Sequence, residues 1–183
     1  MLPHEFGKYG FGYKPFGQPE KPRVFVSYHH ENDQWYYDRF NELFSNVYDI
    51  LTDRSVDRNI RSDDAEYQMR RIREDYITGS SLTIVLCGVE SYKRKFIDWE
   101  ICATLNKQHA LLGINLPTNL ANRDGMFVVP ARLHDNIESG YAGWMLWSEV
   151  PSELAQNLNA AKSKASETRL IQNGRDTMNR NLI

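Results

Sequence analysis

The segment Ser80 to Leu105, SSLTIVLCGVESYKRKFIDWEICATL, contains both the clearest strand of this 183-residue chain and its most suggestive carboxylate. Its first part, Leu82 to Cys87, is a continuous apolar and β-branched run between Gly79 and Gly88. Such a run is typical of a strand that helices cover on both faces. We therefore expect Leu82 to Cys87 to be the central strand of a sheet.

A helix is predicted after this strand and a turn from Gly88 to Lys93, because Ile97, Ile101 and Leu105 recur every four residues. Glu100 lies at the margin of that apolar face, four positions after Phe96. No basic residue stands three or four positions from it, where intrahelical ion pairs form. We therefore expect no ion-pair partner for Glu100 within its own predicted helix, which is unusual among the acidic residues of this chain.

Other acidic residues do have such neighbours, for example Asp98 with Arg94 and Glu74 with Arg70, and we expect solvated ion pairs of little energetic weight there. A carboxylate beside aromatic residues and without a local cation is a candidate functional group with a raised pKa. The alternative is a partly exposed Glu100 that a distant arginine or a backbone amide satisfies.

Composition limits the class of protein. Lys and Arg total 22 and Asp and Glu total 24, so no global field attracts the chain to nucleic acid or membrane. The two cysteines, Cys87 and Cys102, are expected to be small buried residues in a reducing compartment. The sequence has no CxxC or His/Cys cluster typical of zinc, no membrane-length apolar run and no signal-peptide hydrophobic region. We expect a soluble cytoplasmic protein without a metal.

The rest of the chain alternates between predicted strands and helices. Further strands are expected at Arg23 to Tyr28, Val47 to Leu51, Ala110 to Leu116 and Met126 to Val129. Further helices are expected at Asp33 to Ser45, from near Asp63 to Gly79, and from Pro151 onward. This alternation predicts an α/β fold of three layers: a five-stranded, parallel, flavodoxin-like sheet with helices on both faces.

Three units are expected along the sequence: an arm over residues 1–22, a domain over 23–150, and a last helix with its tail over 151–183. The arm interleaves aromatic residues with glycines, so it is either mobile or docked on the domain or on a neighbouring protomer. Gly140 to Trp147 is expected to be a loop or short helix against the sheet edge, and the tail from about Gln172 is expected to be frayed.

Polar side chains follow the first two predicted strands. Ser27, Tyr28 and His29 leave the first strand at the edge where Asp53 and Ser55 leave the second. Glu100 would approach from the helix after the third strand. Ligands of such folds bind at this edge, near the switch in strand order, so these residues are the candidate site.

The sequence lacks the motifs of several common enzyme classes. The sequence has no GxGxxG after the first strand, no GxxxxGK[ST] and no GxSxG elbow. It also lacks the acidic pair of a phosphoacceptor receiver. Dinucleotide-dependent dehydrogenases of Rossmann type, P-loop NTPases and α/β-hydrolases are therefore disfavoured.

Two stretches resemble TIR domains. RVFVSYHHEND (23–33) resembles their first box, and SLTIVLCGVESYKRKFIDWEI (81–101) resembles their third strand and following helix. The similarity is greatest to the bacterial TIR-like family that includes the TIR subunit of the Thoeris anti-phage system, and it extends over about Pro22 to Ala131. The chain departs in DRSVDRN (53–59), which lacks the Arg-Asp-x-x-Pro-Gly of animal adaptors, and in Phe96, which replaces the usual Trp.

The resemblance implies a TIR-type fold and cleavage of NAD at the nicotinamide-ribose bond. It implies Glu100 as the catalytic acid, Phe96 in the aromatic position, and Ser27, Tyr28 and His29 at the start of the substrate pocket. NAD would be a substrate rather than a cofactor. The implied product is ADP-ribose or a cyclic or conjugated form of it, which activates a separate effector, and TIR–TIR contacts imply a homo-oligomer.

The sequence is also compatible with two other classes of protein. A non-enzymatic TIR module would act through TIR–TIR assembly alone. A flavodoxin-like transferase acting on nucleosides would use an isolated Glu as its nucleophile. Release of nicotinamide from NAD distinguishes the three classes.

Overall fold

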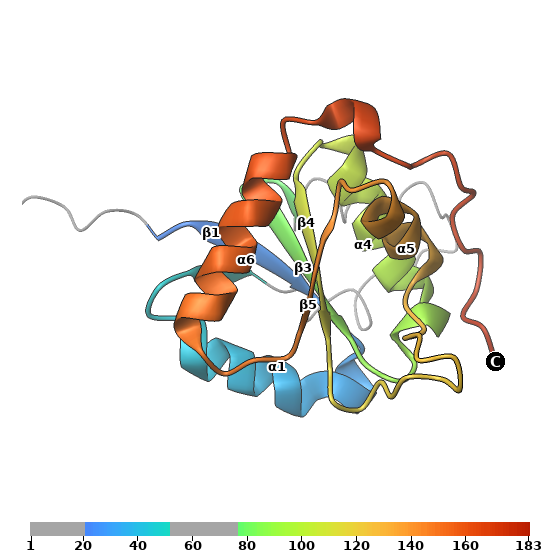
Figure 1. Ribbon diagram of the computed structural model, residues 1–183, viewed down its shortest axis with the longest axis horizontal. Coiled ribbons are helices and arrows are strands. Elements are labelled where there is room, and N and C mark those ends of the chain that lie inside the picture. Colours follow the sequence, from blue (N-terminus) through green and yellow to red (C-terminus); the bar gives the residue numbers. More distant parts are fainter. Residues whose placement is uncertain (1–20, 52–76) are drawn as a thin grey trace, which may run out of the picture.

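The structure is a computed structural model that describes residues 21–51 and 77–183 (Figure 1). Its sheet has five parallel strands in the order β2-β1-β3-β4-β5. The strands are β1 Arg23–Ser27, β2 Asp49–Leu51, β3 Leu82–Cys87, β4 Ala110–Asn115 and β5 Gly143–Leu146. This is the flavodoxin-like order, so the predicted fold class is confirmed.

Helices cover both faces of this sheet (Figure 1). α1 His30–Phe44 and α6 Pro151–Lys164 pack on one face, where they share a core with β1, β3 and β4. α4 Lys95–Asn106 and α5 Ala131–Glu138 pack on the other. Two short 3₁₀ turns, η2 Ser91–Lys93 and η3 Thr168–Leu170, complete the described elements.

The central strand is β3, as its sequence predicts. All six of its residues are buried, and it pairs with β1 on one side and with β4 on the other. β4 is likewise buried throughout. Continuous burial explains why both strands are uninterrupted apolar runs rather than alternating ones.

The fifth strand is not where the sequence predicts it. Met126 to Val129 has no strand structure, whereas β5 lies within the segment that was expected to be a loop or short helix. The Asn119 amide donates to the carbonyl of Val128 (3.1 Å), which helps to hold the predicted strand as a loop. Trp144 of β5 instead lies over Gly113, where an added Cβ would be only 2.7 Å from its ring.

The last described segment is also ordered rather than frayed. Residues 171–182, which we call the C-terminal strap, run past α5 and α4 (Figure 1). Arg132 of α5, which is 0 % exposed, donates to the backbone carbonyls of Arg175 (2.9 Å) and Asp176 (3.1 Å) and to the Asn173 side chain (2.7 Å). The prediction of a frayed tail is therefore wrong for this segment.

The same guanidinium pairs with Asp98 of α4, with 2.9 Å between Nε and Oδ1. Asp98 is 4 % exposed, so the expected solvated pair with Arg94 is wrong. Arg94 instead pairs with Glu90 at 2.7 Å. Sequence spacing favoured a local partner, but packing of α5 on α4 supplied a buried one.

Cys87 and Cys102 are both buried and free, as expected. The predicted helix from near Asp63 lies outside the described residues except at its end, and so does the aromatic arm up to residue 20. Among the described helices, none combines the length and apolar character that crossing a bilayer requires.

Substituting Arg132→Met should lower the free energy of unfolding by about 3 to 5 kcal/mol, because Asp98 would remain buried without its cation. Arg169→Met is the matched control, since Arg169 is 82 % exposed and should change stability by less than about 0.5 kcal/mol. Urea unfolding at neutral pH measures both. A loss below about 1 kcal/mol for Arg132→Met would show that the pair and strap contacts do not stabilise the fold.

Candidate functional site

The carboxyl ends of β1 and β3 lie side by side, because these two strands pair in register from Phe25 with Thr83 to Ser27 with Val85. The chain after β1 leads into α1, and the chain after β3 leads through η2 into α4. The strand order reverses between them, since β2 lies beyond β1 and β4 lies beyond β3. This is the topological switch point at which open α/β sheets bind ligands.

A cavity of about 270 Å³ opens at this edge. Its lining comes from the start of α1, the start of α4 and the C-terminal strap. The lining residues are Tyr28, His29, His30, Glu31, Arg94, Phe96, Ile97, Glu100 and Asn181. Four residues predicted from the sequence therefore meet around one cavity: Tyr28, His29, Phe96 and Glu100.

Glu100 is 6 % exposed and reaches this cavity from the second turn of α4. Phe96 and Ile97, four and three positions earlier, lie on the same side of the helix and line the cavity with it. The Thr104 hydroxyl donates to the Glu100 carbonyl (2.8 Å) and lies 2.7 Å from the Thr83 hydroxyl of β3. The backbone that carries the carboxylate is thus fixed to the central strand.

Tyr28 forms a rigid wall of the cavity. Its ring stacks on Tyr37 with centroids 4.5 Å apart and planes 3° from parallel, and its hydroxyl donates to Gln34 (2.9 Å). The His30 ring lies 4.3 Å away on a tilted plane. The aromatic side chains on the α1 side are therefore held by packing before any ligand arrives.

Glu90 connects the two sides of the cavity. Its carboxylate accepts from Asn32 in the first turn of α1 (3.1 Å) and from Lys93 (3.3 Å) and Arg94 (2.7 Å) before α4. The hydrogen bond from Lys93, followed by that from Asn32, holds the pKa of Glu90 below its ordinary value. Arg94 Nε is buried and has no hydrogen-bond partner among residues 21–51 and 77–183.

The remaining predicted residues are not among the described residues that line the cavity. Ser27 ends β1, is 1 % exposed, does not line the cavity, and its hydroxyl has no hydrogen-bond partner in the described part of the chain. Trp99, the residue before Glu100, does not line the cavity, and its indole N–H donates to the Met178 carbonyl (2.8 Å). Asp53 and Ser55 lie outside the described residues.

Sequence reasoning missed five lining residues. Arg94 and Ile97 lie within two turns of Glu100, and His30 and Glu31 follow His29 directly, so helix spacing offered a signal for these four. The sequence offered no such signal for Asn181. It lies in a polar segment 81 positions after Glu100, and only the path of the strap brings it to the cavity.

A second buried acid lies at the same edge. Asp33 in the first turn of α1 is 0 % exposed, and neither carboxylate oxygen has a standard hydrogen bond within the described ranges. Its carboxylate lies directly against Gly88, where a Cβ could not fit. Burial raises the pKa of Asp33 to about 6, the His29 backbone amide opposes this shift, and the negative charge of Glu90 adds to it. No described group of three or more His, Cys, Asp or Glu residues could hold a metal ion.

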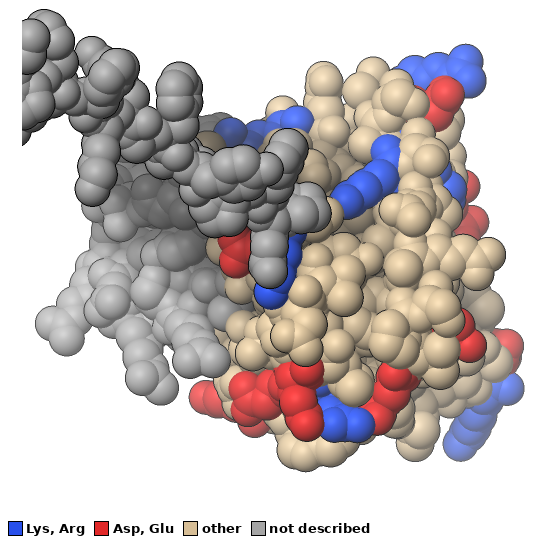
Figure 2. Space-filling model, turned by 90° about the vertical axis from the view of Figure 1, so that its left-hand side faces the viewer, with Lys and Arg blue, Asp and Glu red and all other residues tan. Residues whose placement is uncertain are grey.

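Charge on the outer surface is mixed. Figure 2 shows acidic side chains gathered at the lower edge of one face around a basic one, and scattered basic side chains elsewhere. Arg39 with Glu42 and Glu149 forms an ion-pair group of this kind, with distances of 2.8 Å and 2.6 Å. The described residues on this face form no continuous basic patch (Figure 2).

Substituting Asp33→Asn should stabilise the protein at pH 8 by about 1 to 3 kcal/mol and have little effect at pH 4. The folded-state pKa of about 6 exceeds the ordinary value of 3.8, so the folded form binds the proton more tightly. The stability that protonated Asp33 contributes is complete below pH 4 and is lost as the pH rises through 6. Thermal unfolding at both pH values measures this, with exposed Asp124→Asn as the control. Equal effects of Asp33→Asn at pH 4 and pH 8 would contradict the assignment.

A family model and a solved structure match this chain. The family model described as "Thoeris protein ThsB, TIR-like domain" matches residues 25–121, which include the end of β1 and all of α4 with Glu100. A solved structure, the TIR domains of the activated Roq1 resistosome directly recognizing the pathogen effector XopQ, is similar at 13% identity and a TM-score of 0.38, covering 83% of this chain and 86% of that one. No curated protein sequence gave a match.

The family match spans more than half of the chain and contains the second stretch that resembles TIR domains and all but the first two residues of the first. The chain therefore belongs to the family of the TIR-like domain of the Thoeris protein ThsB.

Proposed function

We propose that this protein cleaves NAD at the nicotinamide-ribose bond and makes an ADP-ribose-derived signal in bacterial defence against phage. The observation that carries the proposal is Glu100, a carboxylate that is 6 % exposed and lines a cavity at the switch point of the sheet. Burying a carboxylate is costly, so a buried acid in a ligand-sized cavity favours a chemical role. The family to which the chain belongs supports the same activity.

The size of the cavity fits part of the substrate. Its volume of about 270 Å³ lies just below the usual range of about 300 to 1,000 Å³ for small-molecule pockets. In this proposal the cavity takes the nicotinamide ring and its ribose beside Glu100. The diphosphate and the adenosine then extend over its opening.

The start of two helices suits the diphosphate. His29, His30 and Glu31 form the N-cap and first residues of α1, and Arg94 is the N-cap of α4. The first N–H groups of a helix have no intrahelical partner, and the helix dipole makes this end positive, so both favour phosphate oxygens. The Arg94 side chain, which lines the cavity, adds positive charge.

Bond cleavage demands charge stabilisation more than proton transfer. The electron pair of the C1–N bond moves to the cationic nicotinamide ring, which leaves neutral, and positive charge develops on the ribose. A carboxylate beside the sugar stabilises this oxocarbenium-like state or binds the ribose hydroxyls, and we assign that role to Glu100. Its backbone, fixed by Thr104 and Thr83, keeps the carboxylate in place during the reaction.

The group that then attacks C1 determines the product. Water gives ADP-ribose, whereas a hydroxyl or nitrogen of the same molecule or of another acceptor gives a cyclic or conjugated product. Tyr28 and Phe96 line the cavity and reduce the room for water beside the ribose. The proposal includes TIR–TIR self-association and an effector that responds to the product.

Replacing Glu100→Gln should reduce nicotinamide release from NAD by a hundredfold or more, because the amide keeps the shape and loses the negative charge. Glu153→Gln is the matched control, since Glu153 is exposed on α6, which packs on the opposite face of the sheet. Chromatography of the reaction separates nicotinamide, ADP-ribose and cyclic products.

The same variants are compared in phage-infected cells, because activity can depend on an assembled or triggered state. Loss of the product in Glu100→Gln cells and its retention in Glu153→Gln cells is the expected result. Equal product from both variants would refute the role assigned to Glu100. No nicotinamide release from the unmodified protein in either setting would refute the proposed function and leave a TIR module that acts by assembly.

A further inference from the structure

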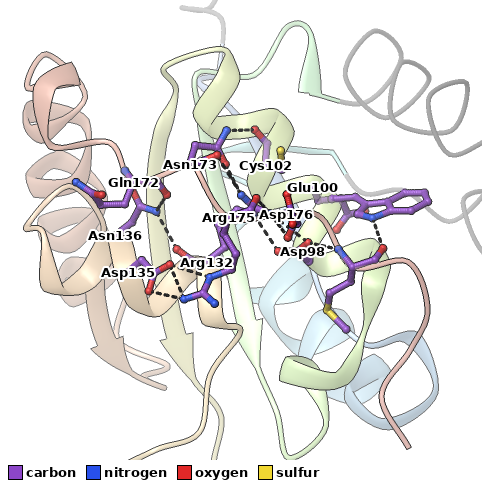
Figure 3. Close-up of polar contacts among 12 residues, drawn as sticks. Asp98, Glu100, Cys102, Arg132, Asp135, Asn136, Gln172, Asn173, Arg175 and Asp176 are labelled. Carbon is purple, nitrogen blue, oxygen red and sulfur yellow. Dashed lines mark hydrogen bonds and ion pairs between the residues drawn. The ribbon is translucent and has the colours of Figure 1, made fainter.

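Hydrogen bonds connect the C-terminal strap to α5 and α4 (Figure 3). At its start, Asn136 of α5 exchanges two hydrogen bonds with the backbone of Gln172 (2.8 Å and 3.0 Å). In its middle, Arg132 donates to several groups of the strap, as described above. These contacts hold the first half of the strap against α5, from which it continues toward α4.

Its later part is bound to α4 and to the turn before it. The Met178 amide donates to Asp98 (2.9 Å) and the Met178 carbonyl accepts from Trp99 (2.8 Å). Beyond it, the Leu182 amide donates to the carbonyl of Lys93 (2.9 Å). The strap therefore ends beside the first turn of α4, at the cavity.

Asn181 is the strap residue that lines the cavity. Its side-chain Oδ1 accepts from the backbone amide of Lys95, the first residue of α4, at 2.9 Å. This bond fixes the orientation of the amide group, because only the oxygen can accept. Within the described ranges no hydrogen bond uses its Nδ2, which is left as a donor at the exposed rim of the cavity.

We propose that Asn181 is a ligand-binding residue whose Nδ2 donates to an acceptor oxygen of the bound dinucleotide, and that the strap is thereby part of the substrate site. This inference rests on the proposed function, since it takes NAD as the ligand. The donor type matches the ligand: diphosphate, ribose and carboxamide groups all present acceptor oxygens. The strap supplies this donor beside the start of α4, at the cavity.

Capping and ligand binding can be separated, because they use different atoms of one side chain. Asp and Asn are comparably good at accepting from a free helix N–H, so Asn181→Asp keeps the bond to Lys95. It removes the donor and places a negative charge beside the phosphates. Asn181→Ala removes both functions.

NAD is titrated calorimetrically into the full chain carrying Glu100→Gln, which prevents turnover, with and without each strap substitution. Asn181→Asp should weaken NAD binding tenfold or more and leave the thermal midpoint unchanged or higher. Asn181→Ala should weaken binding and also lower the midpoint. Asn159→Asp, the same charge change at an exposed position of α6, should alter the affinity less than twofold.

NAD affinity in Asn181→Asp and Asn181→Ala equal to that of Asn159→Asp would overturn the inference, and cleavage of NAD by the unmodified protein would then still stand. Absence of both NAD binding and nicotinamide release would instead refute the proposed function, and the ligand role of Asn181 with it. Nicotinamide release by the unmodified protein therefore distinguishes failure of this inference from failure of the proposed function.

Discussion

Parallel pairing of β1 with β3 is the constraint on which the rest of the molecule depends. The register from Phe25 with Thr83 to Ser27 with Val85 brings the carboxyl ends of the two strands to the same edge of the sheet. Each strand leads into a helix that begins at that edge, and the starts of these two helices line the cavity. The pairing of β1 with β3 therefore positions both sides of the cavity. The apolar core secures this pairing, because β3 is fully buried and a slip of one residue would turn its side chains to the wrong faces.

The helix that carries Glu100 is held from three directions. Thr104 ties it to β3, Asp98 ties it to Arg132 of α5, and Trp99 ties it to the strap. A buried ion pair alone is weak evidence of stability, because desolvation offsets much of the attraction. Here the remaining donors of Arg132 are satisfied by strap oxygens, which is the condition under which such a pair is tolerated in a core. The result is a carboxylate positioned by contacts that involve neither the cavity nor a ligand.

The local sequence pattern correctly predicted the elements that are buried along their whole length. It failed for segments whose structure depends on contacts with residues distant in the sequence. β3, β4 and the meeting of Tyr28, Phe96 and Glu100 followed from apolar runs, helical spacing and the switch-point rule. β5 was missed because it is short and half-exposed, and because the contact of Trp144 with Gly113 spans 31 positions. The strap was missed for a related reason: its residues are polar, and its order comes from α4 and α5 donors and acceptors that no local pattern reveals.

The central claim is that the nucleotide binds where β1 and β3 end, and its most direct test is backbone NMR of the ¹⁵N-labelled Glu100→Gln protein during titration with NAD. We expect shifts concentrated at the residues that line the cavity, which are 28–31, 94, 96, 97, 100 and 181. A larger hollow of about 990 Å³ lies at the opposite edge of the sheet, beside Arg23 and Asp49. Shifts confined to that edge, with the cavity residues unmoved, would contradict the account.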